Sequence, residues 1–498
     1  PSVIKIGSAK PAEAAKPAEA CKAADAAKPA KAEPTIHLSK EDLEDVNPDD
    51  VLPPTKDQVC IVFVGHVDAG KSTMCAHLLL EMDQIDKRAW EKHRAEVSEK
   101  GKDAWLFALA LDTNPEERDK GKTIDVGRSS FETEKKRYIV LDAPGHKAYV
   151  SNMIGGASQA DVAILVISAR RGEFEAGFDK AGQTREHILL CKSTGVKKLI
   201  VAINKMDDET VNWSIERYNE IGKKITPFLR SVGFSSADVT FIPTAGFLGF
   251  GLKNPIPGGP GSGESHPWTG DRETLLGVLD GFESFKRPVH QPLRIILNEK
   301  FRDMGMVVSG RVEGGFVRMN QKVLIMPSRH VAEVSGISIE EEETEFAKAG
   351  DNVRLRLRGA EEEDIYQGSV ICHPRYPVRS AKQFAAQLVI LDAKHIISAG
   401  YQAVIHLHSI VEEITISALL YHIDRKTGKR LKQPPQYLKN GDIAIVRIDC
   451  SSPICMETYE EYPNLGRFTI RDETKTVAMG KILKLNTAAG TVSSTDDN

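Results

Sequence analysis

The chain has 498 residues, of which 41% are hydrophobic and 27% charged, and its formal net charge is −4. These values are typical of a globular protein with several domains, and they argue against a disordered chain or a strongly basic nucleic-acid coat. Its seven cysteines include no C-x-x-C pair, which argues against a zinc site or a disulfide framework.

Residues 1–55 are predicted to form a flexible tail and an acidic linker. The first 34 residues consist mainly of Ala, Lys, Pro and Glu, with too few large apolar side chains to bury a core. No apolar run in the chain is long enough to span a bilayer, and the N-terminus lacks the pattern of a signal peptide. We therefore expect a cytoplasmic protein that does not contact a membrane.

Residues 56–288 are predicted to form an α/β domain. Short apolar runs alternate with amphipathic stretches such as TREHILLCKSTG; the runs are VCIVFVG, YIVLD, DVAILVIS, KLIVAIN and VTFIP. Continuous apolar runs are typical of parallel strands that are buried on both faces. Strands that alternate with helices indicate a doubly wound sheet.

The first apolar run leads into GHVDAGKS, which fits the phosphate-loop pattern G-x-x-x-x-G-K-[ST]. Its glycines let backbone amides converge on phosphates, Lys71 adds a positive charge, and the Ser72 hydroxyl suits Mg²⁺. The residues predicted to bind the phosphates of GTP in this loop are Gly65, His66, Val67, Asp68, Ala69, Gly70, Lys71, Ser72 and Thr73.

A second motif, DAPGH, follows the next predicted strand. Asp142 is predicted to hold Mg²⁺ through water, and Gly145 to donate its amide to the terminal phosphate. His146 is the predicted catalytic residue, because phosphoryl transfer to water needs a group that orients the attacking water. In the charged segment between the two motifs, Thr123 is predicted to add a second hydroxyl to Mg²⁺.

Two further motifs, NKMD and TAG, indicate that the base is guanine. The Asp207 carboxylate can accept two hydrogen bonds from guanine N1–H and its exocyclic amine, a pair that adenine cannot supply. Lys205 can pack its stem over the base. The predicted guanine-binding residues are Asn204, Lys205, Asp207, Thr244, Ala245 and Gly246. Together the motifs predict a GTPase that binds GTP, GDP and Mg²⁺.

Beyond residue 288 the helical pattern gives way to short strands separated by Gly turns, such as MVVSGRVEGGFVRM and YQAVIHLHSI. This pattern predicts antiparallel β-barrels, and the length suits two of them. With the boundary at HPRYP, we place the first barrel at residues 289–373 and the second at 374–498.

The motifs also carry a resemblance to a known family. GHVDAGKST, LDAPGHK, INKMDD and GQTREH resemble the translational GTPases of the elongation factor one-alpha and elongation factor Tu superfamily. GGASQAD, SARRGEFEAGF, VNWSIERY and GRFTIRD resemble more closely the class II release factors, the GTP-binding subunits of the eukaryotic termination complex. Where relatives usually carry a Ser–Gly pair in the last guanine motif, this chain has Ala245–Gly246.

That resemblance implies a GTPase of translation termination, which couples GTP hydrolysis on the ribosome to peptide release. It implies a class I release factor as partner, contacts with ribosomal RNA, and no binding of aminoacyl-tRNA. The predicted partner-binding residues combine aromatic and Arg side chains, as binding hot spots do; they are Arg467, Phe468, Thr469 and Arg471.

Two other functions remain open at this stage. The first is a sibling translational GTPase, either a ribosome-rescue factor of the Hbs type or an aminoacyl-tRNA carrier. The second is a non-catalytic ribosome adaptor, which predicts damage at Lys71, Thr123, Asp142 or His146. All four residues are intact.

Overall fold

The computed structural model describes residues 47–51, 53, 56–85, 123, 125–179, 182–256, 273–302, 305–340, 342–424, 429–431, 433–473 and 475–486. The predicted tail lies almost wholly outside these residues, as does most of the segment that contains Thr123. A short helix, α1 (Pro48–Val51), precedes the first strand. None of the described helices is long and apolar enough to cross a membrane.

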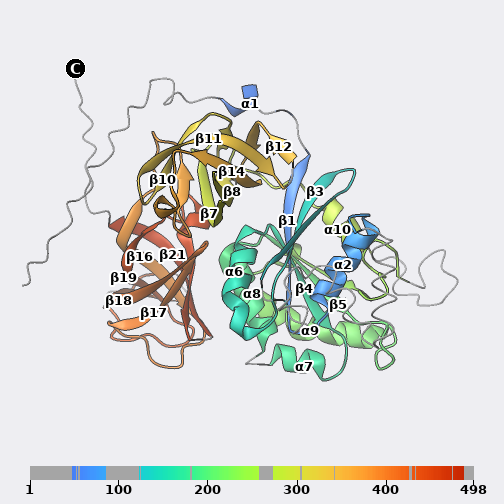
Figure 1. Ribbon diagram of the computed structural model, residues 1–498. Coiled ribbons are helices and arrows are strands. Elements are labelled where there is room, and N and C mark those ends of the chain that lie inside the picture. The colour runs from blue at the N-terminus through green and yellow to red at the C-terminus, as the bar shows by residue number, and fades with distance from the viewer. Residues whose placement is uncertain are drawn as a thin grey trace, which may run out of the picture. The chain divides into compact units, whose positions relative to one another are not determined.

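The first part of the fold is a six-stranded sheet in the order β2-β3-β1-β4-β5-β6 (Figure 1). β2 pairs antiparallel with β3, and all other neighbouring strands in this sheet are parallel. The strands are β1 (Asp57–Gly65), β2 (Gly127–Glu132), β3 (Lys136–Asp142), β4 (Val162–Ser168), β5 (Lys198–Asn204) and β6 (Val239–Pro243).

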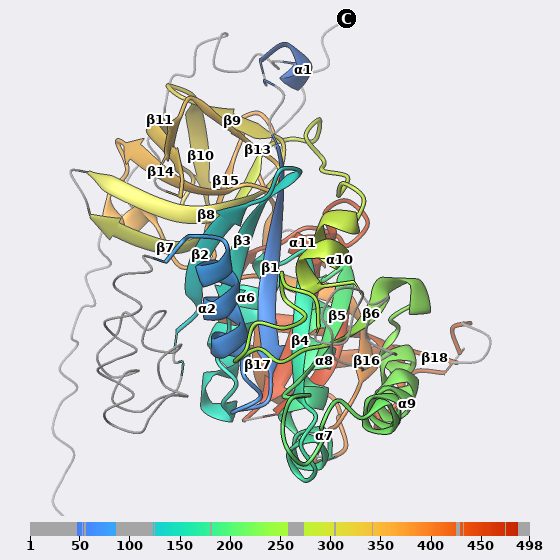
Figure 2. The same cartoon turned by 90° about the vertical axis from the view of Figure 1, so that its right-hand side faces the viewer.

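Helices cover both faces of this sheet. The helices are α2 (Lys71–Glu81), α6 (Val150–Gln159), α7 (Glu173–Phe178), α8 (Gln183–Thr194), α9 (Ile215–Val232) and α10 (Leu275–Gly281), with short 3-10 helices η3 (Lys147–Tyr149) and η4 (Ser236–Asp238). α6 and α8 lie against one face, and α2 and α10 lie against the other (Figures 1 and 2). The predicted doubly wound α/β domain is confirmed.

The position of β1 between two layers of helices explains why residues 59–64 are all apolar. Cys60, Val62 and Val64 belong to the core under α6 and α8. Val59, Ile61 and Phe63 belong to the core under α2 and α10. Because successive side chains of a strand point to opposite faces, a strand between two helical layers needs apolar residues at every position.

The second part is an antiparallel barrel. Its sheet runs β10-β15-β7-β8-β14-β11-β12, and a further pairing of β10 with β11 closes the ring. A two-stranded sheet of β9 and β13 accompanies it. The strands are β7 (Arg294–Arg302), β8 (Met306–Gly314), β9 (Phe316–Arg318), β10 (Lys322–Met326), β11 (His330–Ile339), β12 (Glu342–Thr344), β13 (Phe346–Lys348), β14 (Asn352–Arg358) and β15 (Val370–Cys372), followed along the chain by the next barrel; a 3-10 helix η5 (Glu362–Asp364) precedes β15.

The third part is a closed antiparallel barrel in the order β16-β19-β18-β17-β20-β21. Its strands are β16 (Ser380–Ile390), β17 (Tyr401–Leu407), β18 (Ile410–Ile423), β19 (Ile443–Cys455), β20 (Arg467–Asp472) and β21 (Lys475–Asn486), and α11 (Pro463–Gly466) leads into β20. Alternate residues of β16 (Phe384, Ala386 and Leu388) point into one apolar core. The prediction of two antiparallel barrels after the α/β domain is confirmed.

Candidate functional site

The parallel strands bring the predicted nucleotide motifs to one edge of the sheet. The phosphate loop follows β1, DAPGH follows β3, NKMD follows β5 and TAG follows β6. Parallel strands end at the same edge, which is where open α/β sheets bind ligands. The first motif ends at Ser72 and the last begins at Thr244, so the topology of the sheet explains how motifs so distant in sequence can act together.

The phosphate loop turns at two glycines before α2 begins. Gly70 has φ +97°, and a Cβ there would lie 2.4 Å from the Asn204 amide nitrogen Nδ2. Any larger residue would therefore strain the backbone and push the guanine motif away. This is the close approach for which the motif requires glycine.

Lys71 is buried under the loop, and its ammonium donates to the His66 carbonyl oxygen at 2.9 Å. Burial lowers the pKa of Lys71, while Asp142 and Asp68 favour its charged form. A cation in such a place is suited to a phosphate anion, which would compensate for its lost hydration.

Two predicted Mg²⁺ ligands lie together. The Ser72 Oγ and Thr123 Oγ1 atoms are 3.2 Å apart, although 50 residues separate them in sequence. Asp142, at the end of β3, is buried. Its carboxylate is close enough to Lys71 to influence the lysine's pKa. Hydroxyl and carboxylate oxygens are the ligands that Mg²⁺ prefers, so this donor set fits that ion.

Gly145 packs directly against the phosphate loop. A Cβ at this position would lie 2.4 Å from Lys71 Nζ and 3.2 Å from the Val67 amide nitrogen. The next residue, His146, is partly exposed, and its Nδ1 accepts a hydrogen bond from the Ala148 amide at 3.2 Å. That bond fixes the Nδ1 edge of the ring toward η3, which leaves Nε2 as the atom that can face a water.

Asn204 connects the phosphate loop to the last guanine motif. Its Nδ2 donates to the Ala69 carbonyl at 2.9 Å, and its Oδ1 accepts from the Gly246 amide at 2.8 Å. Thr244 and Ala245 are fully buried beside it. Asn204 thus holds the phosphate loop and the last guanine motif together. Its predicted contact with guanine stays a prediction.

The other predicted guanine-binding residues of NKMD are Lys205 and Asp207. Lys205 has φ +61°, a conformation that non-glycine residues rarely adopt, and its ammonium donates to Glu173 Oε2 at 2.8 Å. Asp207 is exposed. The Met206 amide between them donates to the Thr244 carbonyl, which ties NKMD to TAG.

Sequence reasoning missed a histidine under the phosphate loop. His187 of α8 is fully buried, and its Nδ1 accepts from the Gly65 amide at 3.1 Å. Burial, and then the charge of Lys71, lower its pKa to about 3, so it is a neutral acceptor. The motif GQTREH contains this residue, and a polar side chain on the apolar face of a predicted helix was the available signal.

The predicted partner-binding strand is mostly buried. Phe468 is 2% exposed and packs edge-on against Phe384 at a centroid distance of 5.6 Å. Arg471 is 5% exposed and pairs with Glu186 of α8 at 2.9 Å, and Thr469 is also buried. Only Arg467 is partly exposed, stacked over Tyr459. Partner binding by these four residues stays a prediction.

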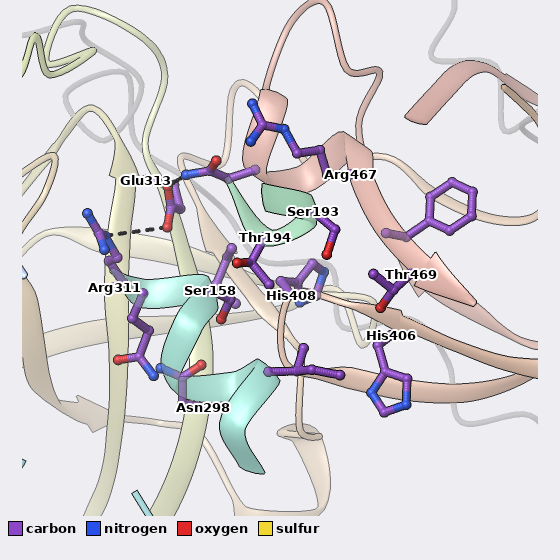
Figure 3. Close-up of a pocket in the computed structure, with 15 residues that line it drawn as sticks. Ser158, Ser193, Thr194, Asn298, Arg311, Glu313, His406, His408, Arg467 and Thr469 are labelled. Atoms are coloured by element: carbon purple, nitrogen blue, oxygen red, sulfur yellow. Dashed lines mark hydrogen bonds and ion pairs between the residues drawn. The ribbon is translucent and has the colours of Figure 1, made fainter. Parts of the chain in front are cut away.

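Arg467 and Thr469 also line a pocket (Figure 3). Its other walls come from Ser158 and Thr194 of the α/β domain and from Arg311 of β8. Glu313 accepts from Asn464 there and lies 3.6 Å from Arg311 Nε.

Family models match the chain in three consecutive parts. Residues 56–296 match the "Elongation factor Tu GTP binding domain", residues 305–372 match "Elongation factor Tu domain 2", and residues 383–483 match "GTP-eEF1A C-terminal domain-like". The chain belongs to the elongation factor Tu family of GTP-binding proteins. The nucleotide motifs described above all lie in the first matched part.

Curated relatives extend the match across the domains. A Kluyveromyces lactis protein named "Eukaryotic peptide chain release factor GTP-binding subunit" is 48% identical over 433 residues, which are 86% of this chain and 61% of that protein. The protein of the same name from Zygosaccharomyces rouxii is 47% identical over 432 residues, 86% of this chain and 64% of that protein. The chain thus spans about three fifths of the length of these relatives.

A solved structure supports the fold. The crystal structure of the S. cerevisiae Ski7 GTPase-like domain bound to GTP has a TM-score of 0.68 and 16% sequence identity, covering 86% of this chain and 97% of that one. At this identity the likeness shows the arrangement of an α/β domain and two barrels, and the chemistry depends on the residues of the site.

Proposed function

We propose that the chain is a GTP hydrolase of translation termination. One observation supports hydrolysis most directly: the hydroxyls of Ser72 and Thr123 lie in contact next to the buried Lys71. They lie at the edge of the sheet that also carries NKMD. In this proposal the phosphate loop binds the α- and β-phosphates, and Lys71 neutralises the outer ones.

Ser72 and Thr123 would hold Mg²⁺ directly, with Asp142 holding it through water. The ion would neutralise charge on the β- and γ-phosphates. Gly145 would donate its amide to the γ-phosphate, and His146 would orient water for attack through Nε2. Asp207 and Lys205 would select guanine, with Asn204 holding their loop against the phosphate loop.

The role in termination is supported by the curated relatives, which are named as GTP-binding subunits of the eukaryotic peptide chain release factor. We propose that the chain acts in the cytoplasm on the ribosome, where it contacts ribosomal RNA, and binds a class I release factor. It would not bind aminoacyl-tRNA. We assign the GTPase domain to residues 56–288 and the barrels to 289–373 and 374–498, after a tail at 1–55.

The test is GTP turnover with purified ribosomes, with and without a class I release factor. The chain with Lys71→Ala serves as the control that should not turn over GTP. Stimulation that needs both the ribosome and the release factor would support the proposal. Tight GTP-dependent binding of aminoacyl-tRNA would identify a carrier instead, and the absence of turnover under all conditions would identify an adaptor.

A further inference from the structure

A segment next to the guanine motif has no role in the function proposed so far. Residues 168–175, with the sequence SARRGEFE, leave the end of β4 and begin α7; we call this segment the brace. Residues 204–208, with the sequence NKMDD, leave the end of the neighbouring strand β5, and we call them the guanine loop. β4 and β5 pair in register from Val162 to Ser168, so the two segments emerge side by side.

The first contact between them is made by Glu173. Its Oε2 accepts from Lys205 Nζ at 2.8 Å and from Ser168 Oγ at 2.7 Å. Partial burial would raise the pKa of Glu173, but the hydrogen bonds from Lys205 and Ser168 outweigh it and hold the pKa below its usual value. Glu173 is therefore a carboxylate that fixes the ammonium of the residue predicted to pack over the base.

The second contact joins Arg170 to the end of the guanine loop. Arg170 Nε donates to Asp208 Oδ2, and its Nη1 donates to Glu173 Oε1 at 3.4 Å. The brace thus contacts the guanine loop on both sides of Asp207, at Lys205 and at Asp208. A loop tied at both ends has fewer conformations to lose when a base binds.

The brace itself is anchored by a buried cation. Arg217 of α9 is 5% exposed, and it donates to the Ala169 carbonyl at 2.9 Å and to the Arg170 carbonyl at 3.2 Å. It also makes a two-pronged contact with Glu175, at 3.0 and 3.3 Å. Glu175 in turn accepts from the Gly172 amide at 2.7 Å. These charge-assisted hydrogen bonds fix the brace against α9.

The same segment also borders the phosphate half of the site. Glu173 and Phe174 line a cavity of about 280 Å³ together with phosphate-loop residues His66 and Asp68. A Cβ on Gly177, in the last turn of α7, would lie 3.3 Å from the His66 side chain. A displacement of α7 would therefore disturb both the guanine loop and the phosphate loop.

We infer that the brace pre-orders the guanine loop, and that Glu173 is a positioning residue that lengthens the time a guanine nucleotide stays bound. Lys205 needs such support, because its backbone has the unfavourable φ of +61° and its long side chain has many conformations in solution. This inference rests on the proposed binding of GTP and GDP.

The test is the dissociation rate of fluorescent GDP and GTP from the full chain after mixing with excess unlabelled nucleotide. Glu173→Gln should speed the release of both nucleotides by the same factor, about two- to fivefold, as expected for a partly exposed ion pair. An equal factor is expected because GDP and GTP share the base end. Glu283→Gln removes the same charge from an exposed site outside the guanine loop and should leave both rates unchanged.

A double-mutant cycle separates positioning from a general loss of structure. In a Lys205→Met background, Glu173→Gln should have no further effect on release, because the ammonium that it fixes is gone. If Glu173→Gln does not fold, Arg170→Gln replaces it, since that side chain is 46% exposed and contacts the other end of the loop.

The outcomes are distinct. Wild-type rates in Glu173→Gln, a change confined to GTP, or an equal effect in the Lys205→Met background would each overturn the inference while leaving GTP binding in place. Failure of the wild-type chain to bind either nucleotide would overturn the proposed function and the inference together.

Discussion

Truncation of Phe468 should destabilise the second barrel itself, rather than only remove a contact with a partner. Its ring lies in the barrel core against Phe384, and on the other side it packs on Gly480, where a Cβ would lie 2.2 Å from the Phe468 Cζ. Removal of a buried Phe side chain costs about 3–5 kcal/mol. We expect the upper half of that range, because Gly480 has no side chain that could move into the space.

Hydrogen exchange measured by mass spectrometry suits this multidomain chain, because it reports the stability of each domain separately. Peptides from β16, β19 and β20 should lose most of their protection in Phe468→Ala, whereas peptides from β1, β4 and β5 should keep theirs. Phe247→Ala is the matched control, since Phe247 is 46% exposed in the α/β domain and its loss should change stability by about 0.5 kcal/mol or less.

A loss of protection worth less than about 1 kcal/mol in the barrel peptides would refute the reasoning. If such a variant also lost affinity for a class I release factor, Phe468 would contact that partner, as the sequence predicts. Arg467→Ala supplies the comparison on the same strand, because Arg467 is only partly buried and its removal should spare the barrel.

Three further predictions concern the nucleotide site and a buried ion pair. His146→Ala should bind GTP nearly as tightly as the wild type and lose ribosome-stimulated turnover, measured by phosphate release; unchanged turnover would remove His146 from its role. Asp207→Asn should shift nucleotide preference from GTP toward xanthosine triphosphate, measured by competition with fluorescent GDP, and retained guanine selectivity would contradict the assignment. Asp161 is buried and accepts from Arg287, Arg311 and the Cys60 amide, so Asp161→Asn should cost about 3–5 kcal/mol at pH 7. Burial opposes ionisation of Asp161, but Arg311 and Arg287 hold its pKa far below the usual range. Its stabilisation is therefore complete above pH of about 4 and declines at lower pH, so urea unfolding should show a smaller difference between variant and wild type at pH 3 than at pH 7; an equal difference at both would be the contrary result.

The sheet and the barrels were predictable because their signals are local. The run from Val59 to Val64 reads as a buried parallel strand without knowledge of its neighbours, and it is one. The closing contacts of the barrels, β10 with β11 and β16 with β21, could not be predicted in register. Strand pairing is set by side-chain packing between distant segments, which periodicity does not report.

The site shows the same division between local and distant signals. The motifs predicted which residues gather at the sheet edge, and Ser72 and Thr123 do lie together. They did not predict that Asn204 joins two loops, or that Glu173 holds Lys205, because those contacts join separate segments. For the strand RFTIRD a local signal existed: Phe468 and Ile470 alternate with polar residues, which places both on the core face.

These contacts change how substitutions in the nucleotide site should be read. Asn204 joins the phosphate loop to TAG, His187 holds the Gly65 amide, and Glu173 joins α7 to Lys205. Each of these side chains bonds to a residue that is predicted to contact the nucleotide: Asn204 to Ala69 and Gly246, His187 to Gly65, and Glu173 to Lys205. Effects of substitutions in one such network are not additive. A loss of GTP affinity at any of the three positions therefore reports a change in the geometry of the loops. Only a variant that affects base recognition and phosphate recognition differently can identify which contacts with the nucleotide were lost.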